Sequence, residues 1–146
     1  MFAPTHTAAA RAYAQVGVET GVATADPHKL VLMLFEGAQL AIIKAKLNMQ
    51  GNNIVAKGEA ISQAISIIDQ GLKASLDVKA GGKMAEKLYA LYEYMCHRLL
   101  MANLKNQPEI LDEVTSLLRE LNGAWNSIGT NQGGSPTCVE NKLRRV

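Results

Sequence analysis

The side chains best suited to chemistry are three that lie close together in the sequence, Glu93, Cys96 and His97. Glu93 and His97 are four residues apart, so on a helix they share one face and could begin a metal site. Metal sites in helical bundles draw ExxH pairs from facing helices, and this sequence contains no ExxH. We therefore interpret Glu93 and His97 as a contact on a solvated helix face, and we expect no metal.

Other catalytic arrangements have little support. The sequence contains no CxxCH, no P-loop, no dinucleotide-binding fingerprint and no GxSxG motif. His6 and His28 have no carboxylate or nucleophile placed beside them, so we expect both at the surface rather than in acid–base catalysis. We predict a protein that is not an enzyme and uses no cofactor.

The sequence predicts four helices, and these would position the side chains named above. The chain has 146 residues, 48% of them hydrophobic, which suits one domain. Asp26 is a good N-cap, Pro27 and Pro108 suit a first helical position, and glycine or asparagine clusters separate the periodic segments. The prediction is an all-α, antiparallel four-helix bundle. Its helices are expected over residues 27–50, 54–76, 83–105 and 109–126.

We expect the bundle to occupy residues 26–128, between two less regular segments. Residues 1–25 form a partly ordered N-terminal arm with one possible helical turn at residues 8–14, and residues 129–146 form a flexible tail. The longest apolar run, residues 30–35, is far too short to span a bilayer, and no signal peptide is readable. We expect a cytoplasmic protein without membrane insertion.

The charge and the cysteine content bear on two further properties, nucleic-acid binding and disulfide formation. Fifteen basic and 13 acidic residues are spread along the chain and give a net charge of +2, so nucleic-acid binding is not expected. Cys96 and Cys138 belong to no CxxC pair, and we expect no structural disulfide between them.

The predicted helix at residues 27–50 has more apolar residues than one buried face can use. One stripe faces the expected core and consists of Val31, Leu34, Phe35, Ala38, Ala41, Ile42, Ala45 and Met49. Nearly opposite, where an isolated bundle would place charge, lie Met33, Leu40, Ile43 and Leu47. We interpret this second row as a surface for a helical partner.

Two more helices show candidate rows on the side away from the core. In the segment 54–76 these are the small or apolar residues Ala60, Ile67, Gly71 and Ala74. In the segment 83–105 they are Tyr94 and Met101. The alternative is structural: a fifth helix or the N-terminal arm covers the second face of the helix at residues 27–50.

Five sequence blocks, in order, resemble one protein family. They are AYAQVGVET (residues 12–20), DPHKLVLMLFEGA (26–38), SQAISIIDQGLKASLD (62–77), LYALYEYMCHRLLMAN (88–103) and LLRELNGAW (117–125). Together they resemble the flagellin-specific export chaperones of the FliS family over about residues 10–126. No single block identifies the family by itself, but the occurrence of all five in the same order is specific to it.

The resemblance implies a cytoplasmic chaperone that binds the C-terminal region of flagellin, which is disordered when free and becomes helical when bound. It also implies that binding prevents premature polymerisation and that the complex is delivered to the flagellar type III export apparatus. The rows described above are then the expected flagellin-binding surfaces, joined by the arm residues Tyr13, Val16 and Val18. Phe35 stands where the family often has tyrosine, so no hydroxyl-dependent role carries over to it.

Two other classes remain open. The surplus apolar rows also fit a homo-oligomeric helical scaffold or adaptor, in which copies of the chain pair with one another. A small helical enzyme or metalloprotein is the third class. On the chaperone interpretation we expect a monomer or weak homodimer when the protein is free.

Overall fold

The structure, a computed structural model, describes residues 26–130, apart from the side chains of Val78, Gly129 and Thr130. The expectations for the N-terminal arm and for most of the tail therefore lie outside the described residues. Within residues 26–130 the fold is all-α, with no strand, as predicted. Its elements are α2 (Pro27–Gln50), α3 (Ile54–Ser66), the π-helix η1 (Ile67–Lys73), α4 (Val78–Lys105) and α5 (Pro108–Thr130).

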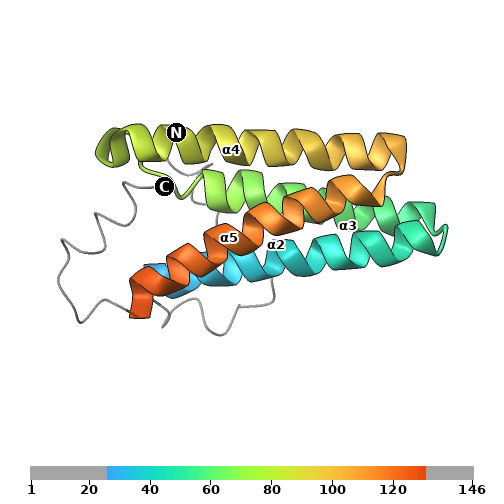
Figure 1. Cartoon of the computed structure of the whole chain (residues 1–146), viewed down its shortest axis with the longest axis horizontal. Helices are drawn as coiled ribbons and strands as arrows, with labels where there is room; N and C mark the ends of the chain where they lie inside the picture. Colours follow the sequence, from blue (N-terminus) through green and yellow to red (C-terminus); the bar gives the residue numbers. More distant parts are fainter. Residues whose placement is uncertain (1–25, 131–146) are drawn as a thin grey trace.

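The helices form a ring in which each packs against two neighbours. α2 packs against α3 and α5, and α4 packs against α5 on one side and against α3 and η1 on the other. Short connections make successive helices antiparallel, so α2 and α4 are diagonal to each other. Figure 1 shows α5 crossing the bundle obliquely: it begins beside the end of α4 and moves away from α4 toward the start of α2. No helix among the described residues is long and apolar enough to cross a membrane.

The core is filled as the periodicity of the sequence predicts. Seven of the eight core residues expected on α2 are buried, and the eighth, Val31, packs against the buried cluster. The other helices contribute large side chains that are fully buried, among them Ile61, Ile68, Leu72, Met95, Leu99, Leu111 and Leu118. Ile54 lies seven residues before the buried Ile61, on the same stripe of α3, and yet is 73% exposed.

Several helix ends follow local sequence signals. The Asp26 carboxylate accepts a hydrogen bond from the Lys29 N–H at 2.7 Å, and Pro27 takes the first helical position. Pro108 begins α5, as predicted. Asn106 ends α4 in the left-handed conformation, with φ 55°.

The segment predicted as one helix over residues 54–76 contains a change of winding. It is α-helical to Ser66 and then π-helical from Ile67 to Lys73, so the assumption of one α-helical period is wrong beyond Ser66. In a π-helix the backbone hydrogen bonds join residues five apart, whereas in an α-helix they join residues four apart. The side chains that follow a π-helical segment therefore point in directions that an α-helical period does not predict.

Two other boundaries differ from the prediction. α4 begins at Val78 rather than at residue 83, because Asp77 caps the turn by accepting a hydrogen bond from the Ala80 N–H at 3.1 Å. Gly82 interrupts this start with φ 58° and ψ −138°, a conformation that essentially only glycine adopts. α5 continues to Thr130, four residues beyond the predicted end at Asn126.

Candidate functional site

The second face of α2 carries a row of exposed apolar side chains, which we call the outer ridge: Leu40, Ile43 and Leu47. Their exposed fractions are 54%, 50% and 63%. They follow one another at spacings of three and four residues, so they form one line along the helix. The prediction of an outward apolar row is confirmed for these three residues, whereas Met33 is half-buried. That a partner binds them remains a prediction.

The row expected on the outside of the next helix is largely inside the protein. Ala60, Ile67 and Gly71 are buried, so their placement on an outward face is wrong, and Ala74 is half-buried. Two causes explain the difference. α3 packs against both α2 and α4, so its buried arc is wider than a single seam and takes in Ala60 and Ile67. The π-helical winding that begins at Ile67 changes the direction of Gly71 further along the chain.

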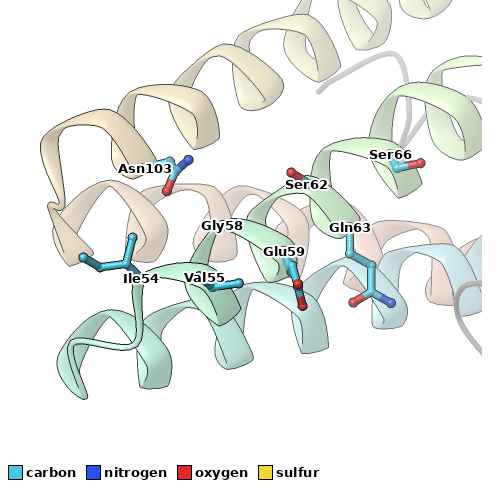
Figure 2. Close-up of a pocket in the computed structure, with 8 residues that line it drawn as sticks. All are labelled: Ile54, Val55, Gly58, Glu59, Ser62, Gln63, Ser66 and Asn103. Carbon is cyan, nitrogen blue, oxygen red and sulfur yellow. The ribbon is translucent and has the colours of Figure 1, made fainter.

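Three small residues, Gly58, Ser62 and Ser66, are spaced four apart along α3; Ser62 is exposed and the other two are half-buried. They lie in a groove of about 760 Å³, together with Ile54, Val55, Glu59, Gln63 and Asn103. Figure 2 shows that Asn103 comes from α4, whereas the other residues follow one another along α3. Our sequence reasoning missed this groove, although the four-residue spacing of small side chains was visible. Its lining is more polar than the outer ridge.

Tyr94 and Met101 occupy different environments on α4. Met101 is half-buried and packs against the core, whereas Tyr94 is 43% exposed. The Tyr94 hydroxyl donates a hydrogen bond to Glu113 Oε2 at 2.5 Å, and Arg98 Nε donates to Glu113 Oε1 at 2.7 Å. These two hydrogen bonds lower the pKa of the Glu113 carboxyl. The network ties α4 to α5 beside the exposed tyrosine ring.

A second apolar surface lies where α5 moves away from α4, and we call it the end cleft. It has a volume of about 450 Å³. Its walls come from three helices and the segment before α4, with Val31, Phe35, Leu76, Met84, Leu88, Tyr92, Leu121, Trp125 and Ile128 as the large apolar residues. Val31 and Phe35 belong to the stripe that was expected to face the core. Phe35 and Tyr92 are themselves buried, whereas the other seven are half-buried around the cleft, where the oblique course of α5 takes it away from α4 (Figure 1).

His28 is half-buried against Trp125, one of the residues that line this cleft. Its ring is stacked on Trp125, with ring centroids 5.1 Å apart, and the Trp125 indole N–H donates to the His28 carbonyl oxygen at 3.0 Å. These contacts join the start of α2 to the end of α5. The expectation that His28 is a surface residue is therefore wrong, because half-burial against Trp125 removes much of it from water.

The residues considered first for chemistry do not form a reactive site. Glu93 and His97 are exposed on α4. Burial raises the pKa of the half-buried Cys96 thiol to about 11, so little nucleophilic thiolate exists at neutral pH. Among residues 26–130, no three histidine, cysteine or acidic side chains are placed to hold a metal ion.

Comparison with known proteins identifies the family. Residues 9–132 match the family described as flagellar protein FliS. The chain belongs to the FliS family. It is 51% identical to the flagellar secretion chaperone FliS of Salmonella typhimurium, an alignment that covers 81% of this chain and 87% of that relative.

More distant relatives carry the same description. Identity to the Escherichia coli flagellar secretion chaperone FliS is 46%, over 79% of this chain and 85% of that protein. Identity to the Bacillus subtilis flagellar secretion chaperone FliS is 29%, over 73% and 78% respectively. The protein is therefore a helical flagellar secretion chaperone of the FliS family and not an enzyme.

Proposed function

We propose that this FliS-family protein works in the cytoplasm and binds the C-terminal region of flagellin. Binding prevents premature polymerisation, and the complex is delivered to the flagellar type III export apparatus. The membership of the family supports a role in flagellar secretion. The observation that supports the proposal further is the outer ridge, because a contiguous row of large exposed apolar side chains typically marks a site where a partner binds.

The ridge and the end cleft suit different parts of a long helical client. A row of apolar side chains at helical spacing receives the apolar face of an amphipathic helix. The end cleft accepts larger side chains between α2, α4 and α5. Ordering a disordered segment costs conformational entropy, so a client of this kind needs a large apolar footprint, which two separate surfaces provide.

The arm residues Tyr13, Val16 and Val18 complete the proposed binding surface. They lie outside the described residues, and the resemblance to the family supports their role. Masking the apolar face of the client explains the block on polymerisation, because the same face is then unavailable to other flagellin molecules. No nucleotide is required for binding. Release then depends on competition or unfolding at the export apparatus.

Size-exclusion chromatography with light scattering tests this function. The purified protein is mixed with flagellin of its own organism, either full-length or lacking the C-terminal segment. We expect a 1:1 complex with the intact protein and none with the truncated one. Absence of a complex with intact flagellin would reject the proposal.

The same measurement on a ridge variant tests where flagellin binds. Leu40→Glu combined with Ile43→Glu places two charges in the ridge and should abolish the complex while circular dichroism shows unchanged helix content. A matched control, Ser116→Glu with Gly123→Glu, adds the same charge at exposed positions of α5. Wild-type affinity of the ridge variant would exclude the ridge as a binding surface.

A further inference from the structure

The end cleft has an almost wholly apolar lining, so its few polar side chains decide which hydrogen bonds an occupant can make. Among the described residues that line it, four carry a side-chain nitrogen or oxygen atom: Ser75, Asp77, Tyr92 and Trp125. An occupant that displaces water from the cleft loses the hydrogen bonds that this water made, unless the protein replaces them. The state of these four side chains therefore determines which client groups the cleft accepts.

Three of the four side chains are already bonded within the protein. The Ser75 hydroxyl donates to the Leu72 carbonyl oxygen at 2.8 Å, and the Trp125 indole N–H donates to the first turn of α2. The Asp77 carboxylate accepts a hydrogen bond from the Ala80 N–H at 3.1 Å, and a carboxylate has no proton to donate. None of these three side chains therefore offers a free donor to the cleft.

Tyr92 differs from the other three. Its side chain lies on α4 and is only 3% exposed, and its hydroxyl forms no hydrogen bond within residues 26–130. Two side-chain polar atoms in this range are sealed from solvent without a partner, His28 Nε2 and Asn122 Oδ1, and the Tyr92 oxygen is not one of them. The oxygen therefore reaches open space, and because Tyr92 lines the end cleft, that space is the cleft. The cleft thus contains one unused donor, on a side chain that packing holds in place.

The acceptor that suits this donor is an uncharged one. Burial raises the pKa of the Tyr92 hydroxyl, because the phenolate would lose its solvation, so the hydroxyl keeps its proton at neutral pH. Moving a charged acceptor into an apolar cleft costs more than one hydrogen bond to a neutral donor contributes, and the Asp77 carboxylate already lies in the lining. A carbonyl oxygen, which is uncharged and has two lone pairs, fits the cleft.

We propose that Tyr92 is a positioning residue for the client, and that its hydroxyl donates a hydrogen bond to a carbonyl oxygen beside the apolar client side chain that fills the end cleft. The inference rests on the proposed function, since it takes the C-terminal region of flagellin as the occupant. The carbonyl belongs either to the client main chain or to an asparagine or glutamine side chain. A purely apolar occupant would bury the hydroxyl without a partner, so Tyr92 selects clients that bring an acceptor.

The substitution Tyr92→Phe removes only the hydroxyl and tests the proposal. Fluorescence anisotropy uses a labelled peptide that spans the C-terminal region of flagellin from the same organism. The variant should bind it about tenfold more weakly, because the client carbonyl is then buried without a donor. The free energy of unfolding should not fall, since the hydroxyl forms no hydrogen bond within residues 26–130. The matched control is Tyr89→Phe, the same change at an exposed position of α4, and it should leave affinity and stability unchanged.

The possible failures of this experiment have different meanings. Equal affinity of the wild type and Tyr92→Phe would overturn the role of Tyr92 but leave the proposed function intact. A loss of affinity that comes with a matching loss of stability would also overturn it, because the hydroxyl would then support the fold rather than the client. Failure of the wild type to bind the peptide would count against the proposed function itself.

A second set of peptides distinguishes the two sources of the carbonyl group. Each asparagine of the peptide is replaced in turn by leucine, and each glutamine by methionine, and every peptide is measured with the wild type and with Tyr92→Phe. A tenfold preference for the wild type that disappears with one peptide identifies that side chain as the acceptor. A preference that all the peptides retain identifies a main-chain carbonyl.

Discussion

Glu113 shows how single side chains hold two helices together at a surface that we assign to binding. Its carboxylate accepts hydrogen bonds from Tyr94 and Arg98, both on α4. The Tyr94 ring stays exposed while its hydroxyl is fixed, so its orientation is set before any partner arrives. Preorganisation of this kind reduces the entropy lost on binding.

The lowered pKa of Glu113 predicts a dependence of stability on pH. Because the folded pKa lies below the usual value of 4.5, the carboxylate stabilises the fold fully above about pH 4.5, and this contribution is lost as pH falls through the folded value. Urea unfolding should therefore show a larger difference between the wild type and Glu113→Gln at pH 7 than at pH 3. The exposed Glu120→Gln controls for the loss of charge. An equal difference at both pH values would show that the network contributes no pH-dependent stability.

At the scale of elements, two glycines have opposite roles in their helices. Gly82 has a positive φ, and it ends the first turn of α4, which lines the end cleft through Ala80 and Gly81. Gly58 lies within α3, and a Cβ atom added there would meet no other atom within 4 Å. The first glycine is required by the backbone, whereas the second only weakens its helix.

Alanine substitutions should separate these roles. Gly82→Ala is expected to destabilise the protein by about 1–3 kcal/mol, because alanine rarely adopts this conformation. Gly58→Ala is expected to stabilise it by about 0.5–1 kcal/mol through lower backbone entropy in the unfolded state. Chemical denaturation measures both free energies of unfolding. The same sign of change for both variants would contradict this account.

At the scale of the whole molecule, the exposed apolar surfaces make self-association the main rival to client binding. The outer ridge alone exposes three large aliphatic side chains. A scaffold would use such surfaces for copies of itself, whereas a chaperone uses them for its client and associates weakly, if at all, when free. A scaffold and a chaperone would have the same fold, so the oligomeric state of the protein, with and without flagellin, is what distinguishes them.

Light scattering over a range of concentrations makes this distinction. We expect a monomer, or a weak dimer whose mass falls on dilution, and we expect any self-association to disappear when flagellin is added. Competition for the same apolar surfaces is the physical reason. A stable oligomer whose mass is unchanged by flagellin would favour the scaffold.

The sequence alone determined the features that depend on neighbours along the chain. The apolar periodicity of residues 27–50 identified both the buried stripe and the outer ridge, because a regular α-helix turns by a constant angle per residue. Asp26 and the prolines marked helix starts through local hydrogen bonding. Five ordered blocks identified the family, which the comparison confirmed.

Features that depend on how the helices pack against one another could not be read from the sequence. Ala60 and Ile67 are buried because α3 packs against both α2 and α4, and the spacing of residues along one helix does not predict how many helices will surround it. The oblique course of α5 leaves the end cleft beside Val31 and Phe35, which periodicity placed in the core (Figure 1). The end cleft gathers side chains from α2, α4, α5 and the segment before α4. Such sites are invisible in sequence because packing, rather than spacing along the chain, sets the distance between their parts.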